Sequence, residues 1–344
     1  MAWALFSGTY LGLGGAFLLL VALGLIGGVL AAVHHAEVVA HRVGEPFGTL
    51  VLAVAVTVIE VALIVSLMFA GGPSTTALAR DTVFAAVMII LNGIVGVCLL
   101  VGAARFREQT FGLDGVSASL ATLAAIVVLT IILPNYTTSD PSPVYVPSQL
   151  AFIAVVSLVI YGTFVFVQTV RHRDYFLPAD EPDNEEMHAA APSLQTTTWS
   201  AILLLVSLGA VVLLAKTLAP SIETGVAAAG APKALVGVII AAVVLLPEGL
   251  AALRAARANR LQTSLNLALG SALASIGLTI PAVAIVSLST GLTLTLGIDT
   301  KSSVLLLLSL FVASLSLGTG RTNVLQGVVH LVIFAVYLFT TIVP

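Results

Sequence analysis

Two glutamates stand inside long apolar runs of this sequence, at positions where a carboxylate is costly. Glu60 lies in "VTVIEVALIV" and Glu248 lies in "VVLLPEGLAAL". A charged side chain at the centre of a membrane helix costs about 2.5–3.5 kcal/mol on insertion scales, so such a residue is a candidate for function. Two neighbouring carboxylates can avoid a buried net charge by binding one divalent cation or by taking one proton each. Because these occupancies exclude each other, the pair indicates exchange of a cation for protons.

The composition indicates that both glutamates belong to an integral membrane protein. Of the 344 residues, 59% are hydrophobic and only 8% are charged, whereas soluble domains are about one quarter charged. The net charge of −3 gives no reason to expect a nucleic-acid partner, and the lipid bilayer is the expected surrounding. We therefore predict an all-α integral membrane protein with about ten transmembrane helices. The apolar runs lie at 9–33, 46–69, 81–104, 116–134, 148–170, 199–218, 233–254, 263–289, 302–318 and 322–343.

The loops between these runs predict an orientation in the cell (inner) membrane. The side with the odd-to-even loops carries nine of the thirteen lysines and arginines. Positive residues favour the cytoplasmic side, so both termini are predicted to lie outside the cytoplasm. The longest polar stretch is rich in acidic residues and proline, and it divides the ten helices into five and five. We predict a first five-helix repeat over 1–171, an acidic cytoplasmic linker over 172–198 and a second five-helix repeat over 199–344.

An odd number of helices in each half has a consequence for topology. The second half must enter the membrane from the side opposite to the first, which is the inverted-topology plan of many secondary transporters. Glu60 lies in the second helix of the first half, and Glu248 lies in the second helix of the second half. Pro247 and Gly249 flank Glu248, and they are expected to loosen its helix. The matched places favour a shared role near the bilayer midplane over two unrelated structural residues.

Hard cations require more oxygen atoms than two carboxylates supply, and calcium takes six to eight. Hydroxyl and amide side chains lie on the glutamate helices or on the helices that follow them, and Pro247 is expected to free backbone carbonyls around Leu245. Taken singly, each such side chain is more common in helix packing than in ion binding. The prediction that they bind an ion therefore rests on their clustering on and after the glutamate helices. The predicted ion- and proton-binding residues are Glu60, Glu248, Thr57, Asn92, Ser271 and Ser275, with both glutamates holding the metal ion.

Four longer stretches are similar to one family of transporters. They are residues 34–68, "FREQTF" at 106–111, the stretch from "LLPEGLAAL" to "IGLTIP" at 245–281 and "GRTNVLQGVVHL" at 320–331. The chain resembles the calcium/proton antiporter family, the cation exchanger branch of the calcium/cation antiporter superfamily, and most of all its bacterial ChaA type. The resemblance covers nearly the whole chain. It implies ten core helices, an inverted repeat, an acidic cytoplasmic linker and one key glutamate in each half.

The resemblance also implies roles for single residues. The two key glutamates of the family fall on Glu60 and Glu248, and the Gly-Ser pair of its eighth helix falls on Gly270 and Ser271. Many exchangers have an asparagine three residues before each glutamate, where this chain has threonine and leucine. The ChaA type is associated with sodium and potassium as well as calcium. The expected activity is Ca²⁺ export in exchange for H⁺ by alternating access, and the alternative is Na⁺(K⁺)/H⁺ antiport.

Several features leave other interpretations open. His34, His35, Glu37 and His41 are interpreted as a polar cap at the cytoplasmic end of the first helix, with a proton antenna or pH sensor as the alternative. His330 lies inside the last helix and is interpreted as a packing residue, with proton relay as the alternative. An intramembrane aspartyl protease is not expected, because no aspartate lies deep in a predicted span. A channel would require a continuous polar path. We expect a transporter that is not an enzyme, with transported ions in place of a cofactor.

Overall fold

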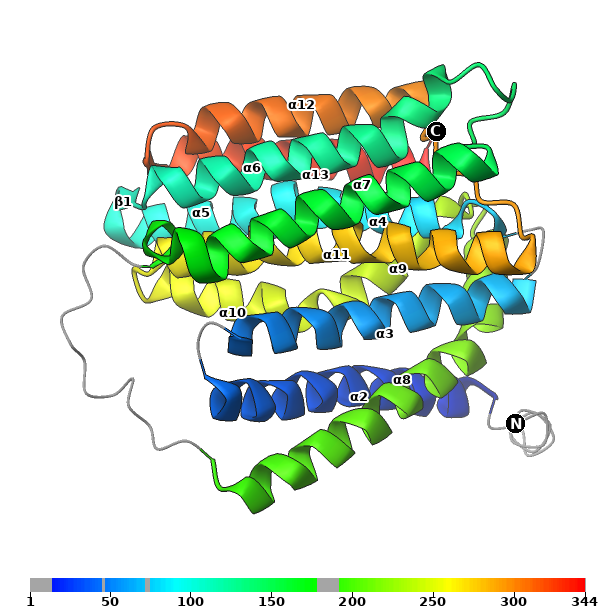
Figure 1. Cartoon of the computed structure of the whole chain (residues 1–344), viewed down its shortest axis with the longest axis horizontal. Helices are drawn as coiled ribbons and strands as arrows, with labels where there is room; N and C mark the ends of the chain where they lie inside the picture. The colour runs from blue at the N-terminus through cyan, green and yellow to red at the C-terminus, as the bar shows by residue number, and fades with distance from the viewer. Residues whose placement is uncertain (1–13, 45–46, 72–74, 178–191, 344) are drawn as a thin grey trace.

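The structure is a computed structural model that describes residues 14–44, 47–71, 75–177 and 192–343. Helices make up almost all of it (Figure 1). The first half contains α2 (Gly14–Val43), α3 (Phe47–Gly71), α4 (Leu78–Met88), η2 (Ile89–Ile94), α5 (Val95–Phe106), α6 (Leu113–Val127), η3 (Val128–Ile132), η4 (Leu133–Tyr136), α7 (Pro147–Phe166), η5 (Val167–Arg171) and η6 (Arg173–Phe176). The second half contains α8 (Leu194–Ala228), α9 (Ala234–Val244), α10 (Leu246–Arg257), α11 (Leu261–Thr290), α12 (Thr300–Leu317) and α13 (Val324–Ile342).

Each of the ten predicted apolar runs overlaps a helix of the structure, and the predicted all-α membrane fold is confirmed. Among the described residues, eight helices are long and apolar enough to cross a membrane, and the bent pair α9–α10 makes a ninth if it is one span. The tenth predicted span corresponds to α3, a helix of 25 residues whose described apolar stretch, Val54–Phe69, is shorter. The strands β1 (Gln109–Thr110) and β2 (Arg321–Thr322) are only two residues each and pair antiparallel at one end of the bundle.

Two helices extend well beyond their predicted bounds. The predicted first span ends at residue 33, but α2 continues to Val43. The small residues Ala32 and Ala36 are fully buried, so one face of the helix stays packed through its polar stretch. His34, His35, Glu37 and His41 lie in the last turns of α2, and their role as a polar cap or a proton sensor stays a prediction. Helix α8 is likewise longer than predicted, with 35 residues.

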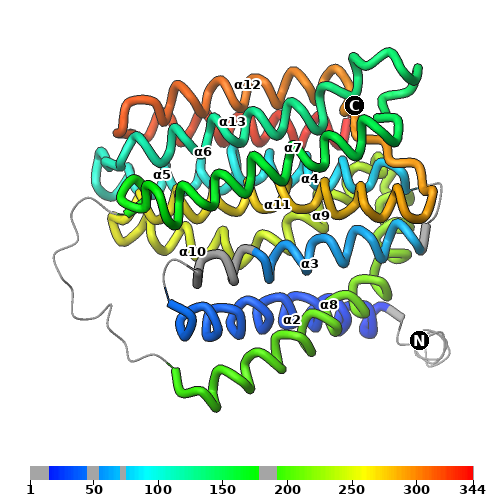
Figure 2. The backbone as a smooth tube through the Cα atoms, viewed as in Figure 1, coloured from blue at the N-terminus to red at the C-terminus, as the bar shows by residue number. Residues whose placement is uncertain are grey.

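The spans lie side by side, and the third span of each half is the most buried (Figure 2). These are α4–η2–α5 in the first half and α11 in the second. Helix α11 contacts every part of α4–η2–α5, and it also contacts α3, α6, α7 and α10. In contrast, α2 and α8 pack most extensively on each other at one edge of the bundle. The beginning of α2 and the end of α13 lie at the same end of the bundle (Figure 1), as an even number of spans requires.

The repeat boundaries and the linker are described only in part. The fifth span ends with η5 at Arg171, and α8 begins at Leu194, a few residues before the predicted start of the second repeat. Residues 178–191 of the predicted acidic linker lie outside the described residues. The assignment of 1–171 and 199–344 to two repeats therefore stays a prediction.

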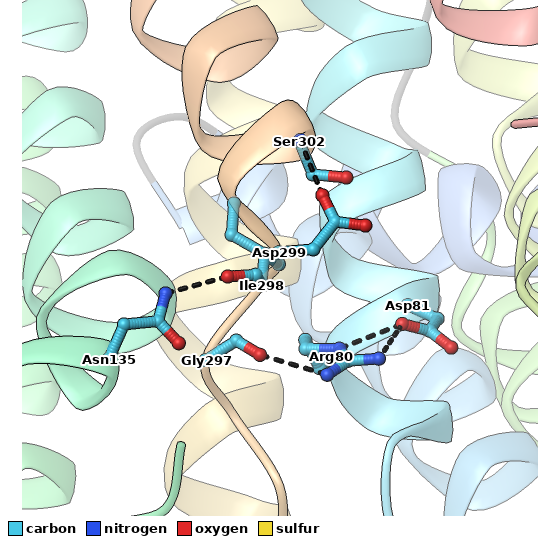
Figure 3. Close-up of polar contacts among 7 residues, drawn as sticks. All are labelled: Arg80, Asp81, Asn135, Gly297, Ile298, Asp299 and Ser302. Carbon is cyan, nitrogen blue, oxygen red and sulfur yellow. Dashed lines mark hydrogen bonds and ion pairs between the residues drawn. The ribbon is translucent and has the colours of Figure 1, made fainter. Parts of the chain in front are cut away.

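Polar contacts tie the two halves together at the end of the bundle where α4 and α12 begin (Figure 3). Arg80 of α4 donates a hydrogen bond of 2.8 Å to the carbonyl of Gly297, and Asn135 donates one of 2.6 Å to the carbonyl of Ile298. The neighbouring Asp299 accepts a backbone N–H and caps α12. The segment before α12 is thus held by side chains of the first half.

Candidate functional site

Glu60 lies midway along α3 and faces the interior of the bundle. The residue is 4% exposed, and its Oε1 atom accepts a hydrogen bond of 2.7 Å from the hydroxyl of Ser275. Ser275 is buried and belongs to α11, in the second half of the chain. A hydrogen bond to a charged group contributes about 1.5–3 kcal/mol. This contact therefore holds the first glutamate against the second half.

Glu248 lies at the break between α9 and α10. α9 ends at Val244, α10 begins at Leu246, and the two helices are bent by 54°. Glu248 follows Pro247 in the first turn of α10, where a proline is tolerated because its missing N–H would have no partner. Glu248 is half-buried, and its Oε2 atom is buried without a hydrogen-bond partner. The predicted loosening of this helix is confirmed as a bend, and it carries an unsatisfied carboxylate oxygen.

The break bears on the prediction of freed carbonyls around Leu245. The carbonyl of Leu245 accepts the N–H of Gly249 at 2.9 Å and so closes the first turn of α10. Pro247 lacks the N–H that would reach the carbonyl of Val243, four residues before it. The last carbonyls of any helix also lack partners within the helix. The carbonyls at the end of α9 are therefore the ones that could be offered to a cation, and this role stays a prediction.

The two glutamates are close enough for their charges to interact. The carboxylate of Glu248 experiences the charge of Glu60 and, to a smaller extent, that of Glu37 on α2. Within the described residues, the one salt bridge joins Arg80 and Asp81 at 2.8 Å, and no base pairs with either membrane glutamate. Like charges at membrane depth without a basic partner need protons or a bound cation. The site is therefore an acidic pair that is open to a cationic ligand.

The three predicted hydroxyl ligands lie on α3 and α11, the helix pair that holds Glu60. Thr57 is buried one turn before Glu60 on α3, and residues three apart share a helix face. Ser271 is half-buried one turn before Ser275 on α11. A Cβ added to the adjacent Gly270 would meet no atom within 4 Å, so there is open space beside Ser271. The role of these hydroxyls as ligands stays a prediction, and Ser275 alone has a hydrogen bond to a glutamate among the contacts described.

The hydrogen bonds of Asn92 are directed toward the C-terminal helices, and its role as an ion ligand stays a prediction. Asn92 is fully buried in η2, where its Nδ2 atom donates a hydrogen bond of 2.9 Å to Ser309 of α12. Its Oδ1 atom lies 3.3 Å from Nδ1 of His330 on α13. Both ends of the amide therefore face α12 and α13. Sequence position alone favoured Asn92 as a ligand because it follows the first glutamate by one helix, and the direction of its side chain could not be read from that position.

The sequence reasoning missed the proximity of Glu37 to the site. Glu37 lies in the last turns of α2 with an exposed side chain, and its charge reaches Glu248. Its neighbour His35 has a buried Nδ1 atom without a hydrogen-bond partner. The signal that could have found them is the repeat of alanine at 32, 36 and 40, because spacing of four residues continues one helix face.

The donors predicted around the acidic pair are all oxygen atoms. They comprise two carboxylates, the hydroxyls of α3 and α11, and the carbonyls at the end of α9, and only Ser275 has a described contact with a glutamate. Oxygen ligands suit hard cations such as Ca²⁺ and the alkali ions, whereas zinc prefers histidine and cysteine. Among the residues that the structure describes, no three His, Cys, Asp or Glu side chains come together as a metal cluster. The site fits a cation that binds and leaves, and it can equally hold protons.

Comparison with known proteins identifies the family. A family model described as sodium/calcium exchanger protein matches residues 13–170 and 199–343. The chain is 51% identical over 328 residues to the putative ionic transporter y4hA of Sinorhizobium fredii, covering 95% of this chain and 89% of that protein. It is 37% identical over 324 residues to the sodium-potassium/proton antiporter ChaA of Escherichia coli, covering 94% of this chain and 87% of that protein.

Solved structures show the same fold at low sequence identity. The structure of native YfkE superimposes with a TM-score of 0.73 at 16% identity, covering 99% of this chain and 98% of that one. The H⁺/Ca²⁺ exchanger CAX has a TM-score of 0.71 at 16% identity, covering 93% and 80% of the two chains. The resemblance predicted from the sequence is thus confirmed. The chain belongs to the sodium/calcium exchanger protein family, and it is a multi-pass membrane cation antiporter and not an enzyme.

Proposed function

We propose that this protein is a secondary active antiporter that exports Ca²⁺ from the cytoplasm in exchange for protons. Glu60 and Glu248 bind either the cation or the protons, and the site opens to one side of the membrane at a time. The observation that carries the proposal is the pair of interacting carboxylates at membrane depth, with which no base forms a salt bridge among the described residues. A relative at 37% identity is named a proton-coupled antiporter, which supports proton coupling.

Charge balance supports the divalent ion. Two ionised carboxylates carry two negative charges, which one Ca²⁺ or two protons neutralise. The empty site would leave two like charges buried together, and each uncompensated charge costs several kcal/mol in a low-dielectric interior. The protein therefore reorients when loaded with either ligand and resists reorientation when empty. This restriction couples the movement of the cation to the opposite movement of protons.

The packing around α2 and α8 supports alternating access. These helices pack chiefly on each other, and they also contact α3, which carries Glu60, and α9, which ends just before the Glu248 helix. A cavity of about 320 Å³ separates the four helices, and its lining is apolar, with Leu25, Leu63, Leu218 and Ile240 among its residues. A helix pair beside an apolar cavity can shift with little loss of polar contacts. The mechanism requires such a shift, because the site must face each side in turn.

The second candidate is antiport of Na⁺ or K⁺ against protons. It is favoured by the direction of Asn92, whose amide faces Ser309 and His330 and adds no oxygen to the acidic pair. Calcium takes six to eight oxygens, and this site brings few beyond the carboxylates. The relative ChaA is named for sodium and potassium. With a monovalent ion, one glutamate would keep a proton while the other holds the cation.

The proposed orientation follows the distribution of positive charge. Nine of the thirteen lysines and arginines lie in loops on one side, which supports a cytoplasmic position for that side. Both termini would then lie outside the cytoplasm, and the acidic linker at 172–198 would lie inside it.

Proton flux in proteoliposomes tests the proposal. Vesicles with purified protein, an acidic interior and an enclosed pH dye receive Ca²⁺, Na⁺ or K⁺ in separate additions. We expect Ca²⁺ to collapse the pH gradient. Collapse by Na⁺ or K⁺ without any effect of Ca²⁺ would select the second candidate. If none of the three cations moves protons, antiport by this chain is wrong.

A double variant and a control variant test whether the proton flux depends on the two glutamates. The double variant Glu60→Gln, Glu248→Gln should lower exchange about a hundredfold or more, because loss of a buried charged partner costs about 3–5 kcal/mol. Glu223→Gln is the matched control, since Glu223 is an exposed carboxylate on α8, and it should exchange like the wild type. Full exchange by the double variant would exclude the two-carboxylate mechanism while leaving transport established.

A further inference from the structure

A chain of buried polar side chains links η2 with α12 and α13. It contains Asn92 of η2, His330 of α13, and Ser309 and Ser316 of α12. Asn92, His330 and Ser309 are 0% exposed, and Ser316 is 6% exposed. An unpaired polar group in such surroundings costs about 1–3 kcal/mol. All four side chains are hydrogen-bonded, so they form one connected network and none of them is an unpaired buried polar group.

The hydrogen bonds define the direction of each donor. Ser309 donates its only hydroxyl proton to the carbonyl of Leu305 at 2.7 Å, so it accepts from Nδ2 of Asn92 at 2.9 Å. Oδ1 of Asn92 is then an acceptor that lies 3.3 Å from Nδ1 of His330, and the His330 ring also hydrogen-bonds the backbone of Leu91 in the same turn. Nε2 of His330 accepts from the hydroxyl of Ser316 at 2.8 Å. A neutral imidazole with its proton on Nδ1 satisfies every member.

The network meets the third span at an irregular turn. Residues Ile89–Ile94 form a π-helix in the middle of an otherwise α-helical span, and such turns are frequent at functional sites. Close packing holds this span against α13. A Cβ added to Gly96 would lie 3.0 Å from Cβ of His330, and one added to Gly93 would lie 3.3 Å from the ring of Phe334. The π-helical turn is therefore pressed against the helix that carries the histidine.

The opposite side of the same turn contacts the second glutamate helix. A Cβ added to Gly249 would lie 3.2 Å from Cδ1 of Ile94, the last residue of η2. Gly249 follows Glu248 directly in the chain, and η2 also packs against α10 and α11. Among the described residues, the Oε2 atom of Glu248 has no hydrogen-bond partner that would fix it. The position of Ile94 therefore bears on the position of the carboxylate.

We propose that Asn92 and His330 are positioning residues for Glu248. The hydrogen bond from His330 to Asn92 holds η2 in its π-helical turn, and η2 supports the bend at Gly249 through Ile94. Asn92 thus serves the site from behind η2 and is not a cation ligand. The effect on transport rests on the proposed function, whereas the effect on the bend does not.

Two substitutions of His330 separate positioning from mere packing. His330→Asn keeps an amide N–H at the δ position, where it can still donate to Asn92. His330→Gln moves that amide by one methylene toward Ser316 and removes the donor to Asn92. We expect His330→Gln to raise the KM for the transported cation about fivefold to tenfold. His330→Asn should keep it within about twofold of the wild type.

Two further measurements keep the test decisive. Leu123→Ala is the control for lost packing, since Leu123 is a fully buried residue of α6, and it should lower the melting temperature without changing KM. Hydrogen exchange of Leu246–Arg257 in detergent needs no transport, and it should become faster in His330→Gln but not in His330→Asn. Equal exchange and equal KM in both His330 variants would overturn the proposal. Absence of transport in the wild type, with the exchange difference retained, would instead overturn the proposed function alone.

Discussion

The two membrane glutamates occupy matched places in the two halves, but their surroundings differ. Glu60 lies on a helix that runs unbroken through the span and accepts a hydrogen bond from Ser275. Glu248 begins a new helix after a bend of 54°, and its Oε2 atom is buried without a partner. Matched positions in the two halves therefore do not require that the two glutamates have the same role in transport. We interpret Glu60 as the held carboxylate and Glu248 as the one that changes partners during the cycle.

Removal of the bend at Pro247 should have the largest effect on transport, because the bend is the main difference between the two glutamate helices. Pro247→Ala restores an N–H that can bond the carbonyl of Val243 and favours a continuous helix. We expect a fall of about tenfold in the maximal exchange rate, because the straightened helix would hold Glu248 in one position. The variant should also melt at a higher temperature. Rate measurements in proteoliposomes and melting in detergent check both expectations.

A second proline in the membrane provides the control for Pro247. Pro281 lies inside α11, which continues without a break. Pro281→Ala should therefore change stability without the tenfold loss of rate. A Pro247→Ala variant that exchanges at the wild-type rate would contradict a special role for the bend.

Loss of the hydrogen bond to Glu60 should have a smaller effect. Ser275→Ala removes the one donor to Oε1, and a hydrogen bond to a charged group contributes about 1.5–3 kcal/mol, part of which water can replace. We expect the KM for the cation to rise about fivefold, with little change in the maximal rate. Ser271→Ala, one turn away on α11, should raise it less. Equal effects of the two serines would mean that Ser275 has no special relation to Glu60.

The smallest expected effect is a change in ion preference, caused by an amide oxygen added near either glutamate. Leu245→Asn places an amide three residues before Glu248, where related exchangers have one. We expect the preference for Ca²⁺ over Na⁺ to rise about threefold, because calcium requires more oxygen ligands. Thr57→Asn, the matched change before Glu60, should do less, since a hydroxyl oxygen is already present there. Competition of the two ions in the proton-flux assay measures both. A larger effect of Thr57→Asn would contradict the roles that we assign to Glu60 and Glu248.

The sequence predicted those features that depend on local composition. Hydropathy located a helix in each of the ten predicted runs, and the rarity of charge inside them singled out Glu60 and Glu248. The direction of a buried side chain depends on neighbours far along the chain, so the sequence could not show that Asn92 turns toward Ser309, 217 positions later. The π-helical turns were missed for the same reason, because tertiary packing and not propensity decides them.

The end of α2 shows the limit of average hydropathy. The polar residues His34 and Glu37 ended the predicted apolar span at residue 33, whereas the helix continues to Val43. Helix α2 continues because Ala32 and Ala36 pack against the bundle while the polar side chains lie on another face. Periodicity of small residues was the better guide here than average hydropathy.

Proton release on cation binding tests the central claim most directly. Purified protein in weakly buffered detergent near neutral pH receives Ca²⁺, Na⁺ or K⁺, and a pH indicator records the protons that leave. If Glu60 and Glu248 hold protons and the cation in turn, the transported cation must release protons from the wild type and none from the Glu60→Gln, Glu248→Gln variant. Cation binding without proton release by the wild type, or undiminished release by the folded double variant, would contradict the account.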